Sequence, residues 1–464
     1  MRVAVVGASL TGLAAGAFLA RRGCEVTVFE AAAHPEWLDD TPTLAGINHV
    51  PGDHLLWGWR SSRPITRLFG ALKDRPGATA RHLLHPVPTG LQVLGHPHRL
   101  DWGDRLAEEI GREFPSALKS WGASTAAWDR EAEALRQAGM GYPFLRPTEP
   151  ATDGRPEARV SEEPPTESPE EATDDTDFAA VAGEALPAEV RPYLDGVTQA
   201  VCWRPLEEVA LPAGLWAMQM LAQEVAVLKE GVDALVRWLA GRLEAAGGSL
   251  RLESTVRAVK FRNRQVRGVS VKEGRRRSTH PAEWVVVAGG EASRLLPRRR
   301  FGAHHRRTVG TMVTCHLAVE EEVIPEPLAP LAAYCPAPGE PVFLVSHNPA
   351  TRHTLNNLPR RVLTVGWREE AQGAEALADP EELPKHLERL MPFLPGRWEL
   401  VPQDETTGSP LMRWPILETD RRDLNPSTPI LGLVTADHHP LPGMATTASL
   451  ILGVAAAEAI LRGP

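Results

Sequence analysis

Two glycines and an acid near the N-terminus have the spacing of a phosphate-binding turn. Gly7 begins the hexapeptide Gly7-Ala8-Ser9-Leu10-Thr11-Gly12, and Glu30 follows 23 residues after Gly7. Glycines there allow a sharp turn and close helix packing, and the free N–H groups of the helix attract a pyrophosphate. A carboxylate at Glu30 accepts hydrogen bonds from ribose hydroxyls, which favours FAD or NAD over a 2′-phosphorylated cofactor. The candidate cofactor contacts are Gly7, Ala8, Ser9, Leu10, Thr11, Gly12, Glu30 and Ala31.

The elements that position this turn are predicted to be a strand, a helix and a second strand. Residues 3–6 are a short apolar run of the kind that a buried parallel sheet uses. Residues 13–20 are small and apolar and predict a helix, which Gly23 ends at a C-cap position. Residues 26–29 predict the second strand. The order of these elements predicts an α/β fold that begins with a Rossmann-like unit.

Further along the chain, hydrophobic periodicity predicts both helices and strands. Apolar residues recur every four positions from Leu106 to Leu118, as on one face of a helix. Helices are expected at 104–139, across most of 180–245 and at 446–462. Strands are expected at 249–256, on both sides of a turn at 262–264, at 284–288, within 311–345, at 361–367 and at 429–435.

Together with the N-terminal turn, three later segments resemble the superfamily of phytoene desaturases and flavin amine oxidases. They are 229–235 (KEGVDAL), the strand 250–256, and the motif GLVTAD at 432–437 with PGMATTA at 442–448. The resemblance covers most of the chain and implies a Rossmann-like FAD-binding domain of the two-dinucleotide-motif type, with an interleaved α+β substrate domain. The implied FAD-binding domain comprises 1–75, 225–300 and 405–464, and the implied substrate domain comprises 76–224 and 301–404.

The resemblance also implies further contacts with FAD. The backbone at Val256 would meet the adenine, and Asp437 would contact the ribityl chain or a phosphate. The backbone N–H groups of Met444, Ala445 and Thr446 would face the flavin pyrimidine ring. A helix that begins near Thr446 directs its dipole at the negative charge of a reduced flavin, an interaction worth about 0.3–1 kcal/mol.

Three departures from the family pattern support a second hypothesis. Ser9 replaces the middle glycine of the turn, where its hydroxyl either crowds a phosphate or hydrogen-bonds to it. No Gly-Gly-Arg loop follows Glu30, and Ala436 stands where the family usually has a glycine before Asp437. The alternative is therefore a flavin-free homologue that acts as a binding or scaffold protein. The C-terminal motif disfavours a third reading, an NAD-binding dehydrogenase.

The sequence assigns no catalytic residue and no metal site. Amine oxidases of this superfamily often carry a lysine near the flavin, but no lysine lies between Lys272 and Lys385. Phytoene desaturase-like members act on long apolar isoprenoids and rely on the flavin for hydride transfer. Four tryptophans either line such a site or pack in the core: Trp57, Trp59, Trp203 and Trp216. His438 and His439 are weaker candidates for a site, whereas His49 and His54 lack convincing partners in the sequence.

The leading hypothesis is a cytoplasmic FAD-dependent oxidoreductase of the desaturase, oxidase or isomerase type. It would transfer a hydride to the flavin from a small, largely apolar substrate, for example an isoprenoid. The basic runs at 298–300 and 304–307 are either solvated loops or a peripheral contact with anionic lipid headgroups. Four scattered cysteines fit a reducing compartment.

The acidity of the chain is concentrated in one segment. The chain has 464 residues, and its net charge of −9 comes from 50 basic and 59 acidic residues. Residues 149–177 alone hold 11 acids and 2 bases, which leaves the remainder neutral in total. This balance argues against a nucleic-acid binder. The acidic, proline-rich composition predicts a disordered insertion at 147–178.

Overall fold

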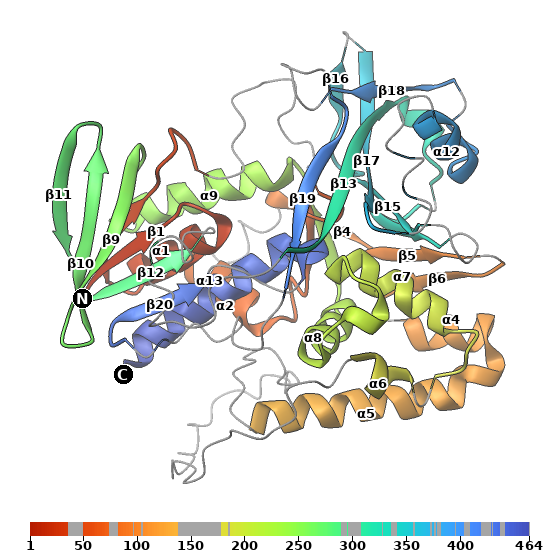
Figure 1. The fold of residues 1–464 in the computed structure, drawn as a ribbon, viewed down its shortest axis with the longest axis horizontal. Coiled ribbons are helices and arrows are strands. Elements are labelled where there is room, and N and C mark those ends of the chain that lie inside the picture. Colours follow the sequence, from red (N-terminus) through yellow and green to blue (C-terminus); the bar gives the residue numbers. More distant parts are fainter. Residues whose placement is uncertain are drawn as a thin grey trace.

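The computed structural model shows two halves joined by a small sheet (Figure 1). It describes residues 1–35, 50–73, 82–95, 97–103, 105–137, 178–183, 186–288, 295, 308–326, 328–335, 341–355, 358–371, 374, 377, 382–394, 396–402, 409–418, 428, 430–436 and 441–463.

One half is built on a parallel sheet of five strands in the order β20-β12-β1-β2-β8. The strands are β1 (Arg2–Val6), β2 (Glu25–Phe29), β8 (Ser249–Arg251), β12 (Trp284–Ala288) and β20 (Leu433–Ala436). Every neighbouring pair runs parallel. The central strands β1 and β12 are almost continuously apolar because both of their faces are covered.

Three helices pack beside this sheet, namely α1 (Leu10–Arg21), α9 (Gly231–Ala245) and α13 (Ala445–Arg462), and α2 (Arg63–Ala71) packs on α13. Small residues bring α1 and α13 close together. A Cβ added to Gly453 of α13 would lie 2.6 Å from the backbone oxygen of Thr11 in α1. Gly23 follows the end of α1 with a φ of 83°, as its predicted role requires.

The last helix, α13, is part of a long apolar segment. The segment Pro442–Arg462 is long and apolar enough to cross a membrane by length and composition. Most of it is buried inside the protein, however, and α13 contacts α1, α2 and β20. Its apolar character is therefore accounted for by its place in the core.

A three-stranded antiparallel sheet packs on the end of the parallel sheet. Its strands are β9 (Ser254–Arg262), β10 (Gln265–Glu273) and β11 (Arg276–Pro281). Asn263 and Arg264 have φ values of 52° and 56°, which suit the two-residue turn between β9 and β10. The inward residues of these strands join a core with residues of β1, β2 and β12.

The other half is a mixed sheet with the path β18-β13-β17-β15-β14-β5-β6, to which β16 and β19 add. Its strands are β5 (Leu91–Leu94), β6 (Arg99–Trp102), β13 (Thr308–Val319), β14 (Leu331–Tyr334), β15 (Phe343–His347), β16 (His353–Leu355), β17 (Leu358–Arg368), β18 (Trp398–Val401) and β19 (Met412–Leu417). The helices of this half are α4 (Leu106–Glu113), α5 (Leu118–Gln137), α6 (Phe178–Gly183), α7 (Arg191–Cys202), α8 (Leu211–Leu221) and α12 (Glu382–Leu390).

The small sheet has the order β3-β7-β4, with β3 (Leu55–Trp57), β4 (Leu84–Val87) and β7 (Val225–Leu228). It joins segments that lie far apart in the sequence and leads from β7 directly into α9. The chain thus alternates between the two halves.

The predicted α/β fold class is confirmed, and most of the predicted elements are present. The helix expected at 104–139 is divided into α4 and α5 by a turn at Pro115–Ala117, because proline cannot continue a helix from its interior. The strand expected at 429–435 begins later, at Leu433. The exact domain boundaries stay a prediction. The predicted disordered insertion 147–178 lies outside the described residues except at Phe178, where the prediction is wrong because this residue is buried and begins α6.

Candidate cofactor site

The turn from β1 into α1 has the backbone of a phosphate-binding loop. Gly7 has a φ of 95°, a conformation that favours glycine. A Cβ added to Gly12 would lie 2.0 Å from the backbone oxygen of Gly7, so no larger residue fits there. Both glycines singled out by spacing are therefore required by the geometry of the turn.

Ser9 is the N-cap of α1. Its Oγ accepts a hydrogen bond from the backbone N–H of Gly12 at 3.3 Å. The hydroxyl is buried and directed along the helix start rather than away from it. The backbone N–H groups of Leu10 and Thr11 have no acceptor among the described residues. These two groups are the donors that the turn offers to a phosphate.

Glu30 ends β2 beside the same turn. Its Oε2 accepts from the N–H of Ala8 at 2.8 Å, and its Oε1 accepts from the N–H of Ala32 at 3.0 Å. Each carboxylate oxygen has a further lone pair, so Glu30 can still accept a hydrogen bond from a ribose hydroxyl. Ala31 is exposed at the rim of this site.

The start of β9 lies next to Glu30. The backbone N–H of Ser254 donates to the backbone oxygen of Glu30 at 2.7 Å. Two residues further on, Val256 pairs with Val271 of β10 and is 2% exposed. The structure therefore brings Val256 to the side of the site where Glu30 lies.

The first turn of α13 supplies a second helix N-terminus. Met444 is the N-cap and makes no side-chain cap hydrogen bond, and the helix begins at Ala445. Met444 and Thr446 are each 1% exposed. A 3-10 turn, Pro442–Met444, precedes the helix. In it the N–H of Met444 donates to the backbone oxygen of Leu441 at 2.9 Å, and the N–H of Ala445 donates to that of Pro442, so these two predicted donors are already paired. Three predicted site residues, Asp437, His438 and His439, lie outside the described residues, as does His49.

The segment 50–57 is fastened to the start of α13. The hydroxyl of Thr446 donates to the backbone oxygen of Asp53. The hydroxyl of Thr447 accepts from the N–H of Trp57 at 2.9 Å and is 3.3 Å from the backbone oxygen of Leu55. This segment is therefore held against the start of α13.

The two helix starts are offset along a common direction. Both α1 and α13 follow a strand of the same parallel sheet and return beside it, so they run the same way. Thr11 of α1 lies against Gly453, eight residues after the start of α13. At 1.5 Å per residue, α13 begins about 12 Å before this contact. The donors of the two helices could therefore meet separate parts of one extended ligand.

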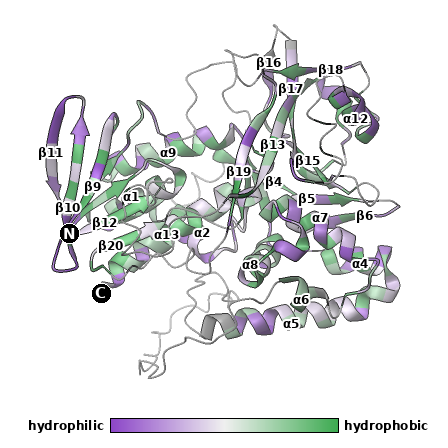
Figure 2. Cartoon of the chain, in the orientation of Figure 1, coloured by the Kyte–Doolittle hydropathy of each residue, from purple (hydrophilic) through white to green (hydrophobic). Residues whose placement is uncertain are grey.

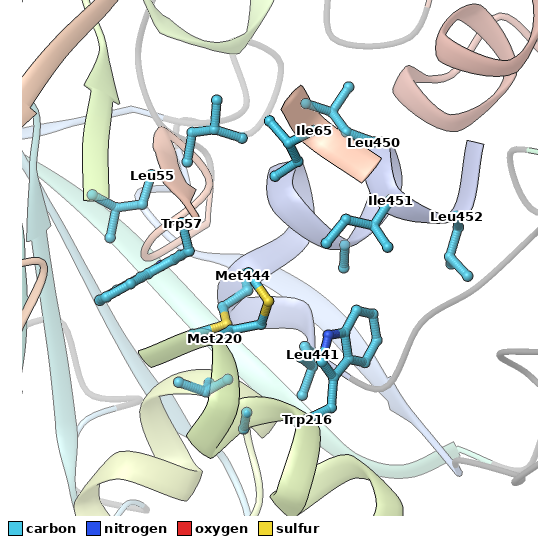
Figure 3. Close-up of a cluster of buried hydrophobic side chains, with 14 of the residues drawn as sticks. Leu55, Trp57, Ile65, Trp216, Met220, Leu441, Met444, Leu450, Ile451 and Leu452 are labelled. Atoms are coloured by element: carbon cyan, nitrogen blue, oxygen red, sulfur yellow. The ribbon is translucent and has the colours of Figure 1, made fainter. Parts of the chain in front are cut away.

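Apolar side chains surround the start of α13. Figure 3 shows Trp57, Met220, Trp216 and Leu441 grouped around Met444. Trp57, Trp216 and Leu441 are fully buried, and Met220 is 4% exposed. Trp203 is also buried, whereas Trp59 is partly exposed and Arg60 lies over its ring at 4.1 Å. Of the four candidate tryptophans, only Trp57 and Trp216 are drawn in this cluster.

One polar group near segment 50–57 was not assigned from the sequence. His54 is fully buried, and its Nδ1 lies 3.7 Å from Oδ1 of Asp53. Among the described residues, neither ring nitrogen of His54 has a hydrogen-bond partner. Burial lowers the pKa of His347 in β15 to about 4, and His54 contributes in the same direction. These residues are far apart in the chain, so no local spacing could reveal the group.

Two family models match the chain. The model described as FAD dependent oxidoreductase matches residues 230–452, and that of the NAD(P)-binding Rossmann-like domain matches residues 5–72. The chain belongs to the FAD-dependent oxidoreductase superfamily. The matched regions of this oxidoreductase contain the turn at Gly7 and the start of α13. None of the curated proteins matches its sequence.

Solved structures share the fold of this oxidoreductase. An oxidoreductase from Methanosarcina mazei is 15% identical with a TM-score of 0.58, over 98% of this chain and 99% of that one. A protein from Pyrococcus furiosus is 14% identical with a TM-score of 0.61, over 100% and 98%. Cyclohexylamine oxidase from Brevibacterium oxydans is 16% identical with a TM-score of 0.58, over 99% and 98%.

The residues of the two helix starts fit different parts of FAD. The N–H groups of Leu10 and Thr11 suit the pyrophosphate, and Glu30 suits a ribose. The positive dipole end of α13 suits an electron-rich ring edge, and the N–H of Thr446 stays a predicted donor, whereas the N–H groups of Met444 and Ala445 are paired within the turn that precedes the helix. The donor set thus matches a dinucleotide, while the individual contacts stay predictions.

Proposed function

We propose that this protein is an FAD-dependent oxidoreductase of the desaturase, oxidase or isomerase type that acts on a small, largely apolar substrate, for example an isoprenoid. The observation that carries the proposal is the pair of offset helix starts on one parallel sheet, with Glu30 beside the first. Bound FAD would supply hydride acceptance at the flavin ring.

The chain's own residues hold and shield the cofactor in this proposal. Leu10 and Thr11 donate to the pyrophosphate, and Glu30 orients a ribose. The positive end of the α13 helix dipole would lie near the part of the flavin that gains negative charge on reduction. Thr446 and Thr447 hold segment 50–57 in place, which keeps water away from that end.

An apolar substrate is favoured by the surroundings of α13. Trp57, Trp216 and Met444 present aromatic rings and a thioether near the helix start, with few hydrogen-bonding groups. The chain has no lysine between Lys272 and Lys385 to hold a water for amine oxidation. We therefore expect hydrocarbon substrates rather than polyamines.

Anaerobic flavin bleaching tests the substrate class. The FAD-loaded protein is mixed without oxygen with a panel of isoprenoid hydrocarbons in detergent and with a matched panel of primary amines and polyamines. We expect loss of the oxidised flavin absorbance with members of the first panel. Bleaching by the amines alone would overturn the apolar assignment, and bleaching by neither panel would count against it.

A flavin-free binding or scaffold protein is the second candidate. It is favoured by Thr446 and Met444, which are buried by the protein's own residues at the start of α13. The hydroxyl of Ser9 also takes up one N–H group of the N-terminal turn. Retention of one FAD per chain after purification would exclude this candidate.

A cytoplasmic location with peripheral membrane contact remains part of the proposal. The basic runs 298–300 and 304–307, on which the contact depends, lie outside the described residues. Sedimentation of the protein with anionic vesicles, compared with neutral vesicles, tests this contact directly. Equal sedimentation with both would remove the electrostatic basis for it.

A further inference from the structure

A strongly basic surface is present in a protein that is acidic as a whole. Residues 251–277 contain ten arginines and lysines against two glutamates, a net charge of +8. They form β9, β10 and their connections, up to the start of β11. The residues outside 149–177 have a net charge of zero, but their charges are not evenly distributed, and residues 251–277 carry a local excess of positive charge.

The two faces of this sheet differ sharply. Val256, Val259 and Val269 are at most 6% exposed and pack toward the parallel sheet. Basic side chains occupy the outer face and the connecting turns. The exposed ones are Arg251, Arg257, Lys260, Arg262, Arg264, Arg267, Arg275, Arg276 and Arg277. Figure 2 shows hydrophilic colouring over β10 and β11 at the end of the molecule. We call these residues the basic face.

The basic face has little compensating charge of its own. Within the described residues, its ion pair is that of Arg251 with Glu273, at 3.5 Å. Lys272 stands directly opposite Arg277 in the β10–β11 ladder. Like charges at such positions destabilise a sheet unless another group neutralises them. The folded sheet therefore presents positive charge that a negative partner would stabilise.

We propose that the basic face binds the acidic segment 149–177 of the same chain. The segment has a net charge of −9, and residues 251–277, which contain the basic face, have a net charge of +8, so the two are nearly equal and opposite. Arginine, which supplies eight of the ten bases, forms bidentate pairs with carboxylates. This inference rests on charge and exposure and does not depend on the bound cofactor.

The covalent connection permits this contact. The described chain leaves α5 at Gln137 and resumes at Phe178. An extended chain spans about 3.3 Å per residue, so the middle of this stretch, about 20 residues from either end, can reach about 70 Å from Gln137 and from Phe178. A folded protein of this length has a radius of gyration of about 23 Å, so the basic face is within reach.

Tethering also favours the segment over a separate polyanion. A segment on a short linker reaches effective concentrations of about 1 mM at its binding site. The tethered acidic segment is therefore the favoured occupant.

Carbodiimide coupling of carboxylates to lysines tests the proposal. The chain has six lysines, and two of them, Lys260 and Lys272, lie on the sheet. We expect coupled peptides that join residues 149–177 to Lys260 or Lys272, with a yield that falls as salt is raised. Lys119 is exposed on α5, the helix that leads into the segment, and serves as an internal control. Coupling to Lys119 alone, or no coupling, would overturn the proposal.

A charge variant sharpens the test without removing the reporter lysines. The triple variant Arg257→Gln, Arg262→Gln and Arg267→Gln should lower the coupling yield about threefold or more, since each exposed pair contributes about 0.2–1 kcal/mol. The matched control, Arg63→Gln, Arg105→Gln and Arg130→Gln, changes three exposed arginines elsewhere and should leave the yield unchanged. Thermal melts confirm that both variants fold. Equal yields in the two variants would contradict the assignment.

Two further outcomes distinguish other occupants. In a dilute mixture of isotope-labelled and unlabelled protein, coupled peptides should contain one label only. Mixed-label peptides would show that a second copy, rather than the same chain, occupies the basic face. Tight binding of a DNA duplex by the intact protein at physiological salt would show that the face is open, which would also overturn the proposal.

Discussion

At the scale of single residues, local spacing predicts the N-terminal turn well. Gly7 and Gly12 act through neighbours within one βαβ unit, so the turn that they form could be predicted from the sequence, while the contact of Glu30 with a ribose stays a prediction. The role of Ser9 as a helix cap was not predicted, because it depends on the conformation of its hydroxyl. The approach of His54 to His347 depends on pairing between distant segments, which no spacing reports.

Glu30 gives a direct test of the cofactor contacts. Replacing it with alanine removes the acceptor for a ribose hydroxyl and for the N–H groups of Ala8 and Ala32. We expect Glu30→Ala to raise the Kd for FAD about tenfold or more, as measured by fluorescence titration. Glu25→Ala changes an exposed acid of the same strand and should leave the Kd unchanged. Equal affinities of the two variants would contradict this role for Glu30.

His347 makes the stability of the protein depend on pH. Its pKa is lowered to about 4 in the folded protein, whereas a free histidine titrates near 6.5. Between these values the unfolded chain binds more protons, so stability is complete above pH 6.5 and falls as pH drops toward 4. The free energy of unfolding should fall by about 3 kcal/mol between pH 6.5 and pH 4.

Urea unfolding at several pH values measures this loss. The variant His347→Gln should lose less stability than the wild type between pH 6.5 and 4. The control His85→Gln alters an exposed histidine and should behave as the wild type does. Parallel curves for all three proteins would show that His347 does not contribute.

At the scale of elements, the contact between α1 and α13 holds the two helix starts in register. The sequence predicts both helices, but not how they touch, because that depends on which glycines meet a neighbour. A Cβ at Gly453 would lie 2.6 Å from the oxygen of Thr11, whereas one at Gly241 of α9 would meet nothing within 4 Å. The two glycines therefore form a matched pair.

We expect Gly453→Ala and Gly241→Ala to have opposite effects on the free energy of unfolding. The first should destabilise by about 1–3 kcal/mol because the two helices must move apart. The second should stabilise by up to about 1 kcal/mol, since alanine favours a helix more than glycine does. Denaturant titration of both variants measures the difference. Stabilisation by both would show that α1 and α13 separate without cost.

At the scale of the whole molecule, charge totals proved a poor guide to the surface. The net charge of −9 equals that of residues 149–177 alone, and it gives no sign of the net charge of +8 on residues 251–277. Only the structure shows that most of these bases lie on the outer face of one sheet and in its turns, while Arg276, opposite Glu273, lies on the other side. The alternation of side chains along each strand indicates which of them point outward. That the three strands form one sheet is seen only in the structure.

The central claim is that the two helix starts, Glu30 and segment 50–57 enclose FAD. The most direct measurement is the visible absorption spectrum of the purified protein, before and after incubation with FAD and removal of the free cofactor. We expect flavin absorbance equivalent to one FAD per chain. A protein that stays colourless after incubation with excess FAD would contradict it and would favour the flavin-free alternative.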